Sequence, residues 1–374
     1  MTIAINWKTG FEIELAAPRN VTREDLAKAL AAKNGDMVER FFHPQSEPSK
    51  VTGRPTFENL THGFRVTNSE GQWIASFVDD LTLQADFDKR APSLPGWCRI
   101  VSDDRRLLRL IMLQCDPNDS PEDVLQPLAR LFDTEIVSHG SGMFQVSDDR
   151  GQSIAICAPL PGERQRPCEI ITAPIVSDHH TRLADLLDSA REMGFLLPRE
   201  GATHIHFDAA PVCSAATIAR LVRLLARFGD DLKQLVGSNP HCVRLGAWPK
   251  ELQILTDSPE FLAMAWPDAR AELTKVKLSK YCDFNLLNIA KEDKAKHSFE
   301  IRILPSTLDA DEILHATALF EGLLRLACGS TNPDDILSGS FAAFLPAIPM
   351  PANCARYWQA RFEQQNKLVT TPSV

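Results

Sequence analysis

The sequence lacks long apolar runs and paired cysteines. No uninterrupted apolar stretch approaches the ~20 residues that a membrane-spanning helix needs, and the first residues do not combine a basic start with an apolar run. The nine cysteines contain no C-x-x-C pair, which argues against a cysteine-ligated zinc site and indicates reduced thiols. We therefore expect a cytoplasmic protein without a membrane partner.

The sequence also lacks an excess of basic residues and the two common nucleotide-binding loops. Its formal net charge is −9 at pH 7, whereas nucleic-acid binding needs a concentrated basic surface. Neither G-x-G-x-x-G nor G-x-x-x-x-G-K-[ST] occurs. The charge argues against a nucleic-acid partner, so we expect none. If a nucleotide is bound, neither of these two loops holds it.

Strand and helix patterns are intermixed along the 374 residues. Alternating or apolar segments predict strands over residues 11–15, 64–67, 73–78, 168–172, 203–208 and 299–304. Amphipathic segments predict helices over residues 22–33, 178–193, 214–229 and 309–327. This mixture, which includes hairpins, favours an α+β fold with a mainly antiparallel sheet and helices on one face.

Residues 95–160 form a segment that we predict to be an inserted β-α-β-β unit. Its predicted elements are a buried strand over 106–114, a helix over 121–132 and a hairpin of 142–146 with 153–158. A further strand is expected over residues 81–87. We expect one catalytic domain over residues 1–330, followed by a proline-rich extension over 331–374 with a short helix.

Acidic and imidazole side chains share one face of several predicted strands. Residues i and i+2 of a strand point to the same side, and the residues between them point to the other side. In these strands the residues between the charged pairs are apolar. The pairs are Glu12 with Glu14, His204 with His206, and Glu300 with Arg302, while Glu169 lies in another strand. Any one strand fits a solvated face, but clustered carboxylates repel one another unless cations bind between them. Carboxylates with imidazole suit Mg²⁺ or Mn²⁺, and an arginine among them suits phosphate.

Five motifs in order carry a resemblance to a known family. They are Gly10-Phe-Glu-Ile-Glu14, Cys168-Glu-Ile-Ile-Thr-Ala-Pro174, Thr203-His-Ile-His-Phe-Asp208, Lys280-Tyr-Cys-Asp-Phe-Asn285 and Ser298-Phe-Glu-Ile-Arg302. Together they resemble the amidoligase family of the carboxylate–amine ligase superfamily, which includes glutamine synthetase and glutamate–cysteine ligase. The resemblance covers roughly residues 8–90 and 165–330. It implies a glutamine-synthetase-like curved sheet with helices packed on its outer face.

The resemblance implies a role for each matching residue. Glu12 and Glu14 would each serve one of two metal sites, and Glu169 would complete the site near the amino-acid substrate. His204 and Glu300 would join Glu12 at the metal that bridges the ATP phosphates. The remaining candidates are Arg302 for the transferred phosphoryl group, His206 for phosphate or for support of the site, and Lys280, Arg244, Asn285 and Asp80 for substrate or phosphate.

The implied activity is an ATP- and Mg²⁺- or Mn²⁺-dependent ligase that joins a carboxylate to an amine through an acyl phosphate. The carboxylate and amine partners are small molecules or peptides, and self-association is left open. Two alternatives remain at this point. A metal-dependent amidase could use the same cluster with an activated water, and a binding protein could retain the fold without activity.

Overall fold

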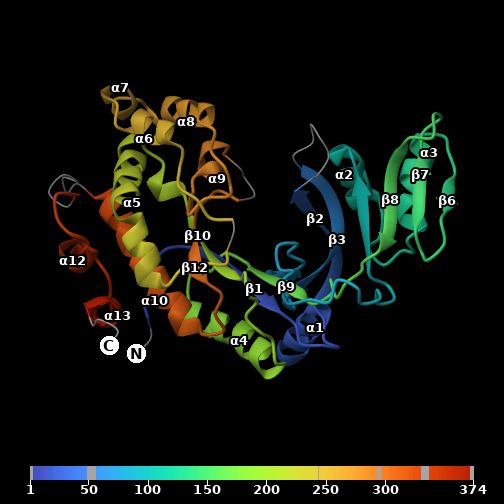
Figure 1. The fold of residues 1–374 in the computed structure, drawn as a ribbon, viewed down its shortest axis with the longest axis horizontal. Helices are drawn as coiled ribbons and strands as arrows, with labels where there is room; N and C mark the ends of the chain where they lie inside the picture. Colours follow the sequence, from blue (N-terminus) through green and yellow to red (C-terminus); the bar gives the residue numbers. More distant parts are fainter. Residues whose placement is uncertain (1–2, 49–55, 243, 293–295, 330–336, 371–374) are drawn as a thin grey trace. The chain divides into compact units, whose positions relative to one another are not determined.

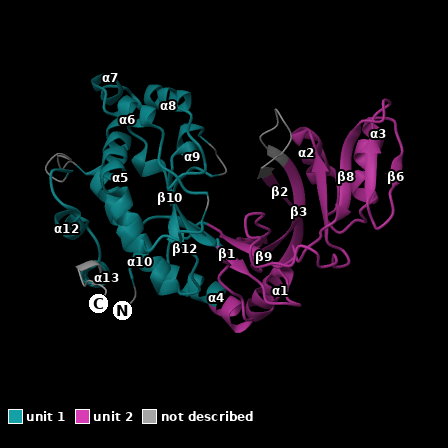
Figure 2. Ribbon diagram, viewed as in Figure 1, with its two compact units in different colours: residues 1–13, 174–187, 200–374 teal, residues 14–173, 188–199 magenta. Residues whose placement is uncertain are grey.

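A computed structural model describes residues 3–48, 56–242, 244–292, 296–329 and 337–370. The chain divides into two compact units, shown in Figure 2. The first comprises Met1–Ile13, Pro174–Leu187 and Glu200–Val374, and the second comprises Glu14–Ala173 and Asp188–Arg199. Strand β1 (Thr9–Ala16) and helix α4 (His179–Glu192) each run from one unit into the other. The fold is α+β, as expected, and none of the described helices has the length and apolarity needed to cross a membrane.

The sheet of the first unit is antiparallel and has the order β11-β12-β10-β1. Its other strands are β10 (Ala202–Asp208), β11 (Phe284–Asn285) and β12 (Ser298–Pro305). The apolar side chains that alternate along these strands are fully buried, for example Ile205, Phe207 and Ile301. Helices α5 (Ala215–Val236) and α10 (Ala310–Cys328) pack against this face (Figure 1). The charged side chains of the same strands are therefore on the opposite face.

Helix α5 follows its predicted pattern and extends beyond the predicted end. Ser214 caps it, because its hydroxyl oxygen accepts a hydrogen bond from the backbone N–H of Thr217 at 3.1 Å. The helix passes through Gly229 and ends at Gly237, which has a φ of 72°. The helix is longer than predicted because Leu232 continues the apolar stripe and is fully buried. Left-handed backbone at a helix end is what glycine tolerates best.

The first unit contains further helices besides α5 and α10. They are η2 (Ala210–Val212), α6 (Lys250–Thr256), α7 (Pro259–Leu262), α8 (Trp266–Lys275), α9 (Leu287–Ala290), α12 (Phe341–Phe344), η3 (Leu345–Ala347) and α13 (Ala352–Thr370). The predicted short C-terminal helix is thus part of the longer α13. Phe344 stacks on Phe228 of α5 with ring centroids 4.2 Å apart, so the C-terminal residues pack on the core of the first unit.

The second unit contains an eight-stranded antiparallel sheet. Its order is β9-β4-β3-β5-β8-β7-β6, with β2 paired to β3. The strands are β2 (Met37–Pro48), β3 (Thr56–Thr67), β4 (Trp73–Val78), β5 (Cys98–Ser102), β6 (Ile136–Ser138), β7 (Phe144–Ser147), β8 (Ser153–Pro159) and β9 (Pro167–Thr172). The helices are α1 (Arg23–Asn34), α2 (Arg105–Gln114), η1 (Asp123–Leu125) and α3 (Gln126–Leu131). Thr22 caps α1 with a capping box, which confirms the predicted helix start.

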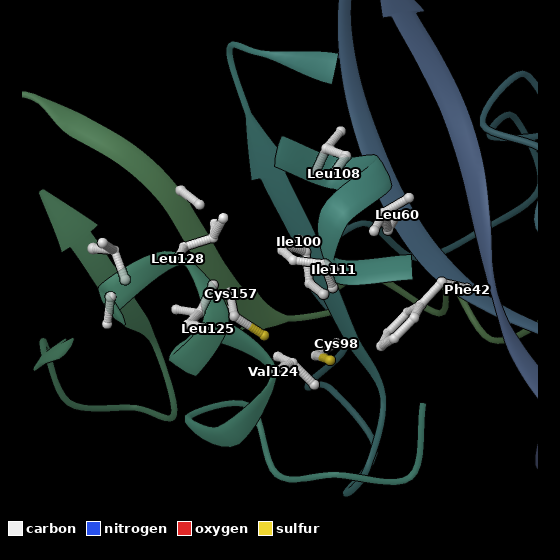
Figure 3. Packing of buried hydrophobic residues seen from close by; sticks show 13 residues of the cluster. Phe42, Leu60, Cys98, Ile100, Leu108, Ile111, Val124, Leu125, Leu128 and Cys157 are labelled. Atoms are coloured by element: carbon white, nitrogen blue, oxygen red, sulfur yellow. The ribbon is translucent and has the colours of Figure 1, made fainter. Parts of the chain in front are cut away.

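Two strand predictions in the second unit are wrong. Residues 106–114 lie in α2, because Leu108 and Ile111 are buried at helical spacing and Asp104 caps the helix by accepting from the N–H of Arg106. The region is therefore a β-α-α-β-β-β arrangement rather than β-α-β-β. Leu108 and Ile111 pack with Ile100, Leu125 and others in the cluster of Figure 3. Residues 81–87 form turns rather than a strand.

A fully buried arginine joins three segments of the second unit. Arg23 at the start of α1 donates to the carbonyl oxygens of His62 (3.1 Å) and Arg164 (2.6 Å). Its charge is offset by Asp79, which lies 3.9 Å from Arg23 and 2.7 Å from Arg164. Burial lowers the pKa of Arg23 to about 10, so the guanidinium remains charged at neutral pH. A buried charge of this kind is tolerated because it is both paired and hydrogen-bonded.

The close contact between α10 and the C-terminal residues requires glycine at position 322. A Cβ atom there would lie 2.7 Å from Ile348 Cγ2 and even closer to the carbonyl oxygen of Pro349. We predict that Gly322→Ala lowers the free energy of unfolding by about 1–3 kcal/mol, the usual cost of overpacking. Thermal denaturation would measure the effect. Gly329→Ala is the control, since the nearest atoms to its Cβ are at 3.4 Å and 3.5 Å, and an equal change in both variants would contradict the steric explanation.

Candidate active site

The register of three strands brings the predicted metal ligands together in the first unit. Glu12 of β1 is opposite His204 of β10. His206, two residues further along β10, is opposite Glu300 of β12. Alternation places all four side chains on the face away from α5 and α10.

Three of these side chains are close enough to hold one ion. Glu12, His204 and Glu300 each offer a ligand atom, and these atoms all lie within 4.8 Å of one another. His204 Nδ1 is 3.2 Å from Glu12 Oε2 and 3.6 Å from Glu300 Oε1. The three residues are 8%, 3% and 4% exposed. Metal–oxygen distances of roughly 2.0–2.6 Å require ligands that approach this closely, so the donor set fits a divalent cation.

The two carboxylates are ionised despite their burial. Burial by itself raises the pKa of Glu12, but the charges of Lys296 and His206 outweigh it and hold that pKa well below its ordinary value. Burial likewise raises the pKa of Glu300, and His206 and Arg302 bring it below its ordinary value. Two carboxylates are therefore available as anionic ligands at neutral pH.

The two histidines have opposite electrostatic surroundings. Burial, reinforced by the nearby Arg302 guanidinium, lowers the pKa of His204, which leaves the neutral imidazole that a metal ligand needs. Burial also opposes charge on His206, but Glu12 and Glu300 outweigh it and raise its pKa. His206 Nδ1 lies 2.9 Å from Ser298 Oγ, and its Nε2 lies 3.3 Å from Glu12 Oε1. His206 therefore contributes positive charge that balances the carboxylates.

Arg302 and Asn285 hold the Glu300 carboxylate from two sides. Arg302 Nη1 is 2.5 Å from Glu300 Oε1, and Asn285 Nδ2 donates to Glu300 Oε2 at 2.7 Å. Arg302 Nη1 also lies 3.5 Å from His204 Nδ1. The structure thus places a guanidinium and an amide directly beside the candidate metal ligands.

Lys296 is a site residue that the sequence analysis missed. Its Nζ lies 3.1 Å from Glu12 Oε1, and its side chain is 55% exposed. It precedes β12 outside the strand alternation, and no motif marked it. It follows the charged residues 291–294 by two positions, and charged residues are so common between elements that this gave no signal.

The sequence also matches a known protein family over most of its length. The model of a family described as "putative amidoligase enzyme" matches residues 5–324. The chain belongs to this amidoligase family. The family is one of ligase-type enzymes, so the resemblance stated for the five motifs is confirmed. No curated protein matches the chain.

The remaining predicted metal ligands of the amidoligase lie in the second unit. Glu14 is in the part of β1 that belongs to this unit. Glu169 of β9 is opposite Val78 of β4. The two glutamates each offer a carboxylate oxygen, and these oxygens lie within 4.8 Å of each other. Glu14 is buried and Glu169 is half-buried. They form a second pair of acidic groups that can share a cation.

The predicted substrate residues have different surroundings. Asp80 accepts hydrogen bonds from the backbone N–H and the hydroxyl of Thr82, both at 2.7 Å, and so stabilises its own turn. Arg244 and Lys280 both lie over the ring of Tyr281. Only Asn285 of this group contacts a candidate metal ligand among the described residues.

The Glu300 carboxylate is expected to be necessary for metal binding. Glu300→Gln keeps the shape of the side chain but removes its charge. Loss of a group that only hydrogen-bonds a metal ligand already weakens metal binding about tenfold, so we predict that Mn²⁺ affinity falls at least that far. Isothermal titration calorimetry would measure it. Glu260→Gln, an exposed site on α7, is the control. Unchanged affinity in Glu300→Gln would exclude Glu300 as a ligand.

Lys296 is expected to compete with a metal ion for Glu12. Lys296→Gln removes the positive charge that is paired with Glu12. Because the energy of a half-exposed ion pair is small, we predict that Mn²⁺ binds about two- to fivefold more tightly. The same titration with Lys291→Gln, which alters another exposed lysine of this loop, is the control. Weaker binding in Lys296→Gln would show that the lysine supports the ion instead.

Proposed function

We propose that this amidoligase is an ATP- and Mg²⁺- or Mn²⁺-dependent ligase that forms an amide bond between a carboxylate and an amine. The observation that carries the proposal is the approach of Glu12, His204 and Glu300 within 4.8 Å of one another. Arg302 lies directly beside them. Buried carboxylates with an imidazole suit a hard divalent cation, and an adjacent guanidinium suits a phosphoryl group.

The residues of the first unit would hold one ion, and the acidic pair of the second unit would hold another. Glu12, His204 and Glu300 supply two anionic oxygens and one neutral nitrogen to the first. Glu14 and Glu169 supply two carboxylates to the second. A divalent cation held by these residues would supply positive charge to the phosphates. The expected glutamine-synthetase-like curvature of the sheet is part of this proposal.

Arg302 would act on the transferred phosphoryl group. Its guanidinium is held near the ligands by Glu300, and its five N–H donors match phosphate oxygens. When a phosphoryl group arrives, these donors face the charge that develops on its oxygens. His206 would balance the carboxylates or contact phosphate, and Lys280, Arg244, Asn285 and Asp80 are proposed contacts for substrate or phosphate.

The proposed reaction has two steps. The substrate carboxylate attacks the γ-phosphorus of ATP, the bond from phosphorus to the bridging oxygen breaks, and ADP leaves. The amine then attacks the acyl carbon of the acyl phosphate, the C–O bond breaks, and phosphate leaves while the nitrogen loses a proton. Activation is needed because oxide is a poor leaving group and phosphate is a good one. The substrates belong to the class of amino acids, peptides or other small carboxylates and amines.

Release of ADP is the measurement that tests the ligase. We expect the protein to release ADP with Mg²⁺ or Mn²⁺ only when a carboxylate and an amine are both present in a paired screen. Arg302→Ala should lower kcat about 10²- to 10³-fold, the effect of losing a donor to transition-state charge. Arg106→Ala, in which an exposed ion pair on α2 is lost, should turn over like wild type.

Three results would overturn the proposal. Metal-dependent cleavage of amides without ATP would instead assign an amidase. ADP release that is equally fast in Arg302→Ala would exclude the role of this arginine in phosphoryl transfer. A protein that binds carboxylates or amines but releases no ADP with any pair would be a binding protein.

A further inference from the structure

Two cations and an exposed aromatic ring gather in the first unit beside β11. The guanidinium carbon of Arg244 is 5.4 Å from the centroid of the Tyr281 ring, and Lys280 Nζ is 5.2 Å from it. The Tyr281 side chain is 37% exposed, and its ring offers an apolar face together with a polar hydroxyl. The ring is thus partly accessible to a flat molecule, and two cations lie over it.

Neither cation has an acidic partner. Within the described ranges, no carboxylate lies within ion-pair distance of Arg244 or Lys280, whereas the nearby Lys275 and Lys233 pair with Glu272 and Asp283. Cation–π contact stabilises each charge only modestly at an exposed site, by about 0.5–1 kcal/mol. Two unpaired like charges that approach one ring are therefore suited to an anion, and phosphate is the anion that guanidinium and ammonium groups bind best.

Asp283 fixes the position of this cluster. Its Oδ1 accepts from the backbone N–H of Gly246 at 3.0 Å, and its own N–H donates to the Gly246 carbonyl at 2.8 Å. Its Oδ2 is 3.0 Å from Lys233 Nζ of α5. The loop of Arg244 and the loop of Tyr281 are therefore held side by side and attached to α5.

The same residue joins the cluster to the candidate active site. The carbonyl oxygen of Asp283 accepts from the N–H of Arg302 at 3.0 Å. Tyr281 precedes Asn285 by four residues, so their Cα atoms are at most about 14 Å apart. Asn285 itself donates to Glu300. This is a separation that the ribose and the phosphate chain of a nucleotide can span.

We propose that Arg244, Lys280 and Tyr281 form the base-and-phosphate subsite for the nucleotide. The base stacks on the Tyr281 ring, and Arg244 and Lys280 bind the phosphates that are distal to the transferred group. The terminal phosphate then reaches Arg302 and the Glu12–His204–Glu300 cluster. This inference rests on the proposed use of ATP and assigns residues that hold it.

Comparison of ATP with inorganic tripolyphosphate tests the two parts separately. In titrations with Mn²⁺, Tyr281→Ala should weaken ATP binding about tenfold, in keeping with the energy of one stacked base, and leave tripolyphosphate binding unchanged. Tyr281→Phe should bind ATP like wild type, because its ring is retained. Arg244→Ala and Lys280→Ala should weaken both ligands.

Lys277→Ala is the matched control, since Lys277 is an exposed lysine of the same loop. Thermal denaturation and Mn²⁺ affinity without nucleotide should be unchanged in all four variants, which would show that they fold. ATP binding that is equal in wild type and Tyr281→Ala would overturn the stacking role, and unchanged tripolyphosphate binding in both cation variants would overturn the phosphate role. A wild-type protein that binds neither ligand would contradict the proposed use of ATP itself.

Discussion

The pairing of β10 with β1 and β12 is the constraint on which the candidate active site depends. The three strands have buried apolar side chains on one face, where α5 and α10 pack. A shift of one residue in either pairing would move these side chains out of the core and would turn the charged ones into it. Burial of Ile205, Phe207 and Ile301 therefore fixes the register that places Glu12 opposite His204 and His206 opposite Glu300.

This placement has an electrostatic cost that the surrounding residues offset. Glu12 and Glu300 are nearly buried, and like charges at this separation repel. His206, Arg302 and Lys296 lie around them and lower their pKa values. In the proposed function, a divalent ion would take over the charge balance that these residues provide, and the Arg302 guanidinium would then bind phosphate.

The two units use charged residues differently. In the second unit, Arg23 and Asp79 are almost completely inaccessible, and they interact with each other and with Arg164, while Arg23 also donates to backbone carbonyls. They act in stability rather than in chemistry. In the first unit, the side chains of Lys296 and Arg302 are 55% and 11% exposed. Two cations lie over the Tyr281 ring, and no carboxylate of the described residues is within ion-pair distance of them. Among the described residues, the charged groups of the first unit that we propose to be functional are thus less deeply buried than Arg23 and Asp79.

Several strands and helix starts could be predicted from local sequence patterns. The alternation of polar and apolar residues in 203–208 and 299–304 identified both strands and the side chains that share a face. The helix starts at Thr22 and Ser214 followed from their capping residues. These signals are local, because alternation and capping depend on residues only a few positions apart.

Other features were decided by tertiary packing. The segment 106–114 is apolar enough for a strand, and only its packing on Ile100 and Leu125 settles it as a helix. Strand β2 and the first part of β3 were missed, because their partners rather than their composition define them. No motif indicated that Lys296 contacts Glu12. The hydrogen bonds of Asp283 to Gly246 place Arg244 beside Tyr281. The sequence by itself determined which chemical groups are present and which face of each strand is buried in the core. Strand register and loop contacts decided which of those groups lie together, because they join residues that are far apart in the chain.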